Sequence, residues 1–167
     1  TQRFLSYISE QQDDQGELGG QRQRERQHIY ALALPAVPDE ALMCALWQVD
    51  EFEVQRINRE LRAAHSFVFA GDRAYAMHDL VREFVRADLW RARPPGWLEL
   101  NRGIAQARNV LQNQLARWDS DPPETRFDDP DWRGALLNAL NFALWSKDYP
   151  TARTLLLNTW IAARYYN

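Results

Sequence analysis

The sequence predicts a mainly α-helical protein that contains a single β-hairpin, and three observations support this fold class. Apolar residues recur every three or four positions through most of the chain, which is the period of an α-helix. Between Ser66 and Met77 the period changes to two, as in a strand. Prolines and glycines separate the periodic stretches into segments of helical length.

The N-terminal part is predicted to be a short helix followed by a linker. One or two helical turns are expected within Thr1–Gln12, which carries a small apolar face. Gly16, Gly19 and Gly20 then predict a flexible break. The main domain is expected to begin at Gln21.

Three helices are predicted next. The first ends at Pro35 and Pro38, because proline cannot continue a helix. Asp39 occupies an N-cap position before the second helix, at about 40–47. The third spans about Glu51–Ala64. Four of its apolar residues are predicted to face inward: Phe52, Val54, Ile57 and Leu61.

A β-hairpin and a fourth helix follow. The alternation in Ser66–Met77 predicts two strands joined by a turn at Gly71-Asp72-Arg73. The fourth helix is expected to start at His78 or Asp79 and to end before Pro94-Pro95-Gly96. Its apolar face is predicted to comprise Leu80, Val81, Phe84, Val85 and Leu89.

The C-terminal part is also predicted to be helical, over Trp97–Trp118, Trp132–Trp145 and Pro150–Tyr166. Six acidic residues and three prolines within Asp119–Asp131 predict a solvated loop there. The connection at 146–149 is short, so the last two helices are expected to be antiparallel neighbours.

Three helices, a hairpin and a closing helix in this order are typical of a winged-helix domain. We therefore predict three parts. They are an N-terminal helix and linker (residues 1–20), a winged-helix domain (21–93) and an α-helical region (94–167).

The composition excludes several functions. Only Lys147 among the 20 basic residues is a lysine, and Ser146 rather than glycine precedes it, so the chain lacks a phosphate loop. The net charge of −3 does not suit a generally basic nucleic-acid-binding surface. No apolar run is long enough to predict a membrane span.

The cysteine and histidine content argues against disulfides and against a structural metal site. Cys44 is the single cysteine, so no intramolecular disulfide can form, and three histidines beside it do not suggest a zinc cluster. We expect a cytoplasmic protein with no metal site and no catalytic residue in this chain. The chain starts at Thr1 without a methionine, which suggests a piece of a longer polypeptide.

A resemblance to a known family rests on three stretches. Ala31-Leu-Ala-Leu-Pro35, the helix at 40–47 and above all Tyr75-Ala-Met-His-Asp-Leu-Val-Arg-Glu-Phe84 resemble the winged-helix segment of STAND signal-transduction ATPases. These include the NB-ARC switch proteins of immunity, cell death and bacterial regulation. Met77-His78-Asp79 is similar to the MHD motif of that family, and the resemblance covers about Arg24–Arg91.

The resemblance implies a regulatory role. In that family the winged helix packs as a lid on a nucleotide-binding domain, and the motif histidine contacts the β-phosphate of ADP. His78 would thus sense the nucleotide state, and Asp79 would cap the next helix. The chain itself would be neither an enzyme nor a cofactor holder, whereas the parent protein would bind ADP or ATP with magnesium.

The resemblance also implies partners. An upstream nucleotide-binding domain of the same polypeptide would contact this lid, and activation would produce a homo-oligomer. The helices within Trp132–Tyr166 resemble the helical repeats that usually follow in the family, and Asp148–Ala152 is similar to the turn of a tetratricopeptide repeat. Such repeats would relay a signal to the lid.

The main alternative is a winged-helix DNA-binding regulator with a helical dimerisation tail. Arg56, Arg59 and Arg62 line one side of the third helix, which is the recognition position, and Arg73 would lie at the tip of the wing. Two glutamates on the same face favour a solvated helix with internal ion pairs instead. Nucleic acid is a partner only in this alternative. A third hypothesis is a helical adaptor without a ligand.

Overall fold

The computed structural model describes residues 17–69, 75–92 and 97–165. Over these ranges the molecule is mainly helical, with one small antiparallel sheet of two strands. The helices are α2 (Glu17–Ala33), α3 (Glu40–Trp47), α4 (Glu51–Ala64), α5 (Asp79–Ala92), α6 (Trp97–Ala116), α7 (Pro123–Asp128), α8 (Pro130–Trp145) and α9 (Tyr149–Tyr165). The strands are β1 (Val68–Phe69) and β2 (Ala76–Met77).

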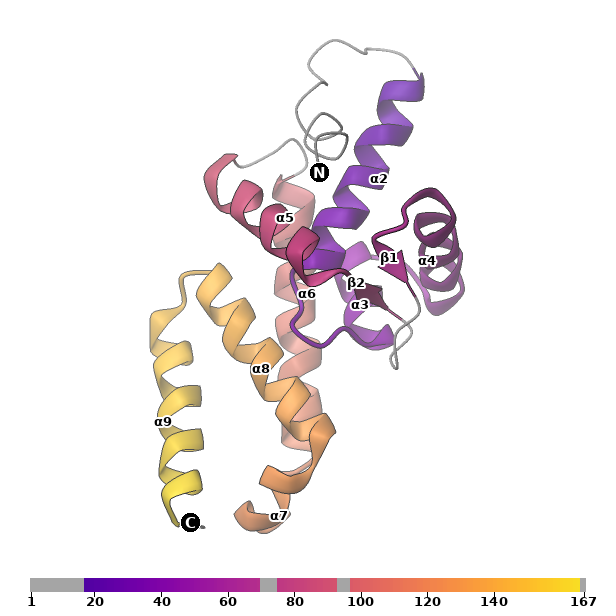
Figure 1. Ribbon diagram of the computed structural model, residues 1–167. Coiled ribbons are helices and arrows are strands. Elements are labelled where there is room, and N and C mark those ends of the chain that lie inside the picture. The colour runs from indigo at the N-terminus through magenta and orange to yellow at the C-terminus, as the bar shows by residue number, and fades with distance from the viewer. Residues whose placement is uncertain (1–16, 70–74, 93–96, 166–167) are drawn as a thin grey trace.

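The elements form two groups (Figure 1). Helices α2 to α5 gather around the small sheet, in which Val68 pairs with Met77 and Phe69 with Ala76. Helices α6, α8 and α9 run away from this group, and α7 lies at their far end. Helix α3 packs on α6, α6 on α8, and α8 on α9. The long helix α6 therefore joins the two groups.

One hydrophobic core runs through both groups. Fully buried side chains come from α2 to α6 and from α8. They include Leu32, Leu42, Met43, Val54, Val85, Leu89, Leu111 and Phe142. The core therefore contains residues from both parts that the sequence predicted, the winged-helix domain (21–93) and the helical region (94–167).

The predicted bounds of α3 and α4 are confirmed, and their N-caps explain them. The Asp39 carboxylate accepts a hydrogen bond from the backbone N–H of Leu42 at 2.8 Å. The Asp50 carboxylate accepts one from the N–H of Glu53 at 2.9 Å. Each satisfies a backbone donor that the first helical turn leaves without a partner.

The predicted flexible break is wrong at Gly19 and Gly20, because α2 begins at Glu17 and continues through both. A glycine in a helix interior costs only about 1 kcal/mol relative to alanine. The buried end of α2, from Ile29 to Ala33, anchors the helix in the core and outweighs that cost.

The predicted loop at Asp119–Asp131 is also wrong in part, since it contains α7 and the start of α8. Proline is well suited to the first turn of a helix, where its missing N–H costs nothing, and Pro123 and Pro130 stand there. Asp129 caps α8 by accepting from the backbone N–H of Asp131 at 2.8 Å. Its carboxylate also accepts from the indole of Trp118 at 3.0 Å.

Phe52 contradicts its predicted inward position, since 74% of it is exposed. Val54, Ile57 and Leu61 are buried as predicted. Phe52 precedes Val54 by two residues, which places it about 200° away around a helix of 3.6 residues per turn. The predictions for Thr1–Gln12, for the turn at 71–73 and for the stop at 94–96 lie outside the described residues.

Candidate functional site

His78 lies at the corner where β2 ends and α5 begins. Its backbone N–H donates to the carbonyl of Phe67 at 2.9 Å, which continues the pairing of the two strands by one residue. Its own carbonyl accepts from the N–H of Arg82 at 2.9 Å and so starts the hydrogen bonding of α5. The backbone of His78 is therefore held by both elements.

The imidazole of His78 is exposed and caps α5. Its Nδ1 accepts a hydrogen bond from the backbone N–H of Leu80 at 3.3 Å. Because Nδ1 acts as the acceptor, a neutral ring carries its proton on Nε2. No described residue accepts a hydrogen bond from Nε2, so this N–H is a donor that solvent or another molecule can use.

The prediction that Asp79 caps α5 is wrong, because His78 takes that role. Asp79 is the first residue of α5 and its carboxylate is 91% exposed. It pairs with the guanidinium of Arg82 at 3.2 Å. Arg82 also donates to the carbonyl of Met77 at 3.4 Å, so it contacts the residues on both sides of His78.

Helix α5 presents apolar side chains to solvent next to His78. Val85 and Leu89 are buried as predicted, but Leu80 is 58% and Phe84 is 41% exposed. These two residues are four positions apart and lie on one face, which an exposed Ala87 continues. We call Leu80, Phe84 and Ala87 the outer stripe of α5.

The outer stripe could have been suspected from the sequence. Five apolar positions were assigned to one face of α5, but those at Leu80 and Phe84 are shifted by one residue from those at Val81, Val85 and Leu89. A shift of one residue is about 100° around a helix. Val81, Val85 and Leu89 pack in or against the core, whereas Leu80 and Phe84 remain exposed.

On α4, the arginine at the centre of the candidate DNA-binding face is already paired with two carboxylates. Arg56 lies between Glu53 and Glu60 and forms ion pairs with both, as the sequence predicted. Its hydrogen bonds hold the pKa of the Glu53 carboxyl below its usual value. Arg59 and Arg62 are exposed on the same helix. The fourth candidate, Arg73, lies outside the described residues.

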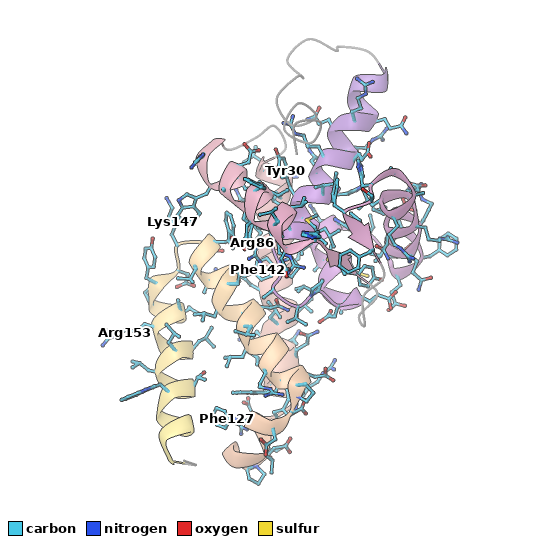
Figure 2. The ribbon with its side chains drawn as sticks, viewed as in Figure 1. Tyr30, Arg86, Phe127, Phe142, Lys147 and Arg153 are labelled. Atoms are coloured by element: carbon cyan, nitrogen blue, oxygen red, sulfur yellow. The ribbon has the colours of Figure 1, made fainter. Side chains whose placement is uncertain are left out.

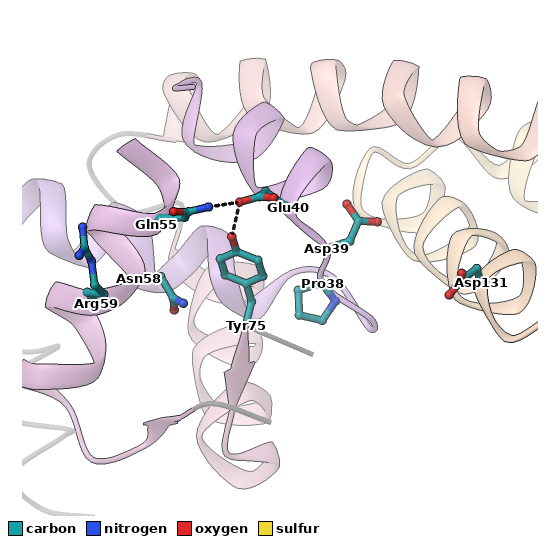
Figure 3. A pocket seen from close by; sticks show the side chains of 8 residues that line it. All are labelled: Pro38, Asp39, Glu40, Gln55, Asn58, Arg59, Tyr75 and Asp131. Atoms are coloured by element: carbon teal, nitrogen blue, oxygen red, sulfur yellow. Dashed lines mark hydrogen bonds between the residues drawn. The ribbon is translucent and has the colours of Figure 1, made fainter. Parts of the chain in front are cut away.

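A hollow of about 670 Å³ opens beside Arg59, between α4, the start of α3 and Tyr75 (Figure 3). Asp39, Glu40 and Asp131 also line it, so three carboxylates and one guanidinium group border the hollow. The Glu40 carboxylate accepts hydrogen bonds from Gln55 at 3.0 Å and from the Tyr75 hydroxyl at 3.2 Å.

The carboxylates of this hollow affect both the Tyr75 hydroxyl and the ligands that the hollow could bind. Burial and the neighbouring Glu40 carboxylate raise the pKa of Tyr75, so its hydroxyl stays protonated and donates. The predominance of carboxylates makes the hollow unfavourable for a phosphate group. His78 therefore lies at the corner between β2 and α5, whereas Arg59 of the alternative set lines an acidic hollow beside α4.

Comparison with protein-family models, with curated proteins and with solved structures finds no match for this chain. Within the described ranges, no helix combines the length and the apolar character needed to cross a bilayer. The same ranges contain no group of three or more histidine, cysteine or acidic side chains arranged to hold a metal ion.

Proposed function

We propose that this chain is the winged-helix lid of a STAND-type signal-transduction ATPase, together with the first helices of the region that follows it. The observation that carries the proposal is the exposed His78 ring, whose Nδ1 is occupied by the helix cap while Nε2 has no hydrogen-bond partner among the described residues. In this proposal α2 to α5 and the hairpin form the winged helix, and α6 to α9 begin a repeat region.

The position of His78 suits contact with a nucleotide phosphate. The ring stands at the N-terminus of the 14-residue helix α5, where the helix dipole and the first N–H groups favour an anion. The N–H on Nε2 supplies a directed donor. ADP, or ATP with magnesium, would be bound by the nucleotide-binding domain upstream in the same polypeptide, and His78 would report which one is present.

The outer stripe is the second feature that supports the lid proposal, because it offers an apolar contact surface. Exposed apolar side chains beside a polar anchor are typical of protein interfaces. Leu80 and Phe84 would pack against the nucleotide-binding domain, while His78 reaches the phosphate. Exchange of ADP for ATP would remove the histidine contact and release the lid, which is a switch between two states. The released form would assemble into a homo-oligomer.

The experiment compares two variants of His78 in the parent polypeptide. His78→Asn keeps a side-chain acceptor for the helix cap but removes the Nε2 donor, whereas His78→Ala removes both. We expect His78→Asn to fold as stably as the wild type and to release ADP about tenfold faster or more, because a hydrogen bond to a charged group is lost. ADP retained after gel filtration gives the measurement.

Gln106→Ala serves as the control, because Gln106 is exposed on α6 and belongs neither to the corner at His78 nor to the outer stripe. It should retain ADP as the wild type does. Wild-type retention in His78→Asn would refute the sensor role. Loss of retention in the control as well would show that the effect is not specific to His78.

The DNA-binding alternative has weaker support, because Arg56 is paired with Glu53 and Glu60 and Arg59 borders an acidic hollow. It remains testable with this chain. Binding to duplex DNA that weakens steeply with salt, and that is lost in Arg59→Ala/Arg62→Ala, would overturn the lid proposal. We expect no such binding at physiological salt.

A further inference from the structure

The connection between α2 and α3 is a buried segment with unusual hydrogen-bonding needs. We call residues Leu34–Pro38 the strap. Leu34, Pro35 and Pro38 are buried. The two prolines have no N–H, and the segment belongs to no helix or strand. Its carbonyl groups therefore need donors from elsewhere in the molecule.

Helix α5 supplies one set of donors through Arg86. Its Nε donates to the carbonyl of Ala33 at 2.7 Å, and its Nη2 donates to the carbonyl of Leu34 at 2.8 Å. Burial lowers the pKa of Arg86, as expected for a cation held mainly by carbonyl groups. The middle of α5 is thereby fixed to the beginning of the strap.

Helix α8 supplies the other set, from residues more than 100 positions away in the sequence. Asn141 donates through Nδ2 to the same Leu34 carbonyl that Arg86 contacts. Asn138 is 1% exposed and binds the strap at Val37 in both directions. Its Nδ2 donates to the Val37 carbonyl at 2.6 Å, and its Oδ1 accepts from the Val37 N–H at 3.0 Å.

The Leu34 carbonyl is thus a shared acceptor for α5 and α8. Figure 2 places Arg86 and Phe142, the neighbour of Asn141, in the region where the two groups of helices meet. A second contact joins the far ends of the same helices, because the rings of Trp90 and Trp145 meet edge to face with centroids 5.4 Å apart. Among the hydrogen bonds and ring contacts of the described residues, the shared carbonyl is the link from α8 that reaches the middle of α5.

We infer that Asn138 and Asn141 are positioning residues: through the strap and Arg86 they fix helix α5, and with it the corner that carries His78, relative to the helical region. A movement of α8 would reach α5 through hydrogen bonds to one backbone carbonyl. The use of this link for signalling rests on the proposed function, whereas the mechanical link itself does not.

The first test is hydrogen exchange of single amides in the 167-residue chain carrying Asn141→Leu, which keeps the size of the side chain and removes its donor. We expect amides in the first half of α5 to exchange about fivefold faster, the effect of one lost hydrogen bond. Amides of α9 should be unchanged. Asn109→Leu is the matched control, because Asn109 is exposed on α6.

A double-mutant cycle tests the route. If Asn141 acts on α5 through the Leu34 carbonyl and Arg86, then Asn141→Leu should have little further effect on α5 once Arg86→Leu is present. Arg91→Leu, at an exposed position near the end of α5, is the control background and should leave the effect of Asn141→Leu intact. Should Asn141→Leu not fold, Asn141→Ala gives the same comparison with a smaller change.

Two results would overturn the inference. Wild-type exchange in α5 of the Asn141 variant would show that the link does not hold this helix. An equal acceleration in α5, α6 and α9 would show general destabilisation without positioning. Either result leaves the role of His78 untouched.

ADP retention in the parent polypeptide separates this inference from the proposed function. If both hold, Asn141→Leu releases ADP faster than Asn109→Leu does. If α5 exchanges faster but neither Asn141→Leu nor His78→Asn changes ADP retention, the link stands and the lid proposal fails. If His78→Asn alone loses ADP and α5 is unaffected by Asn141→Leu, the lid stands and the link fails.

Discussion

His78 performs a structural task that is independent of any ligand, since its Nδ1 satisfies the N–H of Leu80 at the start of α5. Loss of an N-cap side chain costs about 1 kcal/mol. We expect His78→Ala to lower the free energy of unfolding by about that amount and His78→Asn to leave it nearly unchanged. Urea unfolding of the 167-residue chain measures both. Equal stability of His78→Ala and wild type would contradict the cap.

His28 has an environment that makes the stability of the fold depend on pH below neutrality. Burial lowers its pKa below the ordinary 6.5, and the positive charge of Arg56 lowers it further. Its ring lies 5.5 Å from that of Trp47, between centroids. In the unfolded chain the ring is solvated and takes up a proton at its ordinary pKa, whereas the folded chain resists protonation.

The sign of the effect follows from proton binding. Below pH 6.5 the unfolded state binds more protons at His28 than the folded state does, so stability falls as the pH decreases towards the lowered pKa. We expect the urea midpoint to be lower at about pH 5.5 than at about pH 7.5, and the difference to shrink in His28→Gln. An undiminished difference in His28→Gln would assign the pH dependence to another group.

At the scale of single residues, the sequence predicted the location of His78 but not its contacts. The change of period at Met77 placed it at a corner between strand and helix, and the structure confirms this. Asp79 was expected to be the cap because aspartate is a common N-cap residue. The predicted start of the helix at His78 or Asp79 is confirmed, but the cap lies one residue earlier, at His78. Propensity alone cannot distinguish neighbouring residues at a helix start.

At the scale of elements, Gly103 determines how closely α3 and α6 approach. A Cβ atom added at Gly103 would lie 2.4 Å from the backbone carbonyl oxygen of Leu46, far closer than atoms can approach. The oxygen belongs to the backbone of α3, so only a movement of a whole helix can relieve the overlap. Glycine at this position allows α6 to pack on α3.

We therefore expect Gly103→Ala to lower the free energy of unfolding by about 1 to 3 kcal/mol, although alanine favours helix formation. Gly20→Ala is the matched control, since Gly20 is also in a helix and has open space around it. It should raise the free energy of unfolding by up to about 1 kcal/mol. Thermal unfolding compares the two, and a stabilising Gly103→Ala would contradict the close approach.

Helices were predictable from the sequence where local signals agree with the tertiary packing. Helices α3 and α4 were predicted with correct bounds because their caps and their apolar period agree. The helix at Gly19 and Gly20 was missed because local propensity favours a break there, and only the burial of residues 29–34 decides otherwise. Likewise, the short helix α7 lies in a stretch whose prolines and charges favour a loop.

At the scale of the whole molecule, the strap and the core join what the sequence suggested were separate parts. The contacts of Asn138 and Asn141 with residues 34–37 could not be predicted, because no local pattern links positions more than 100 residues apart. The exposure of Leu80 and Phe84 depends likewise on which of two adjacent helix faces the core covers. Both features depend on tertiary packing, which a local sequence pattern does not encode.

A shared core predicts that the two groups unfold together. Phe142 of α8 is fully buried in the same cluster as Leu42 of α3 and Leu89 of α5. Truncation to Phe142→Ala removes a large side chain from this cluster and should cost about 3 to 5 kcal/mol. Because the cluster spans both groups of helices, we expect both groups to lose the same amount of stability.

The measurement is thermal unfolding by circular dichroism together with residue-resolved hydrogen exchange in the 167-residue chain. We expect a single transition that moves to lower temperature in Phe142→Ala, with the slowest amides of α3 and of α8 losing protection to the same extent. Leu137→Ala is the control, because Leu137 is on the same helix and 51% exposed, and its effect should stay within about 0.5 kcal/mol. If α8 instead lost protection while α3 kept it, the two groups would be separate folding units. A movement of the helical region could then not reach the corner at His78 through a common core.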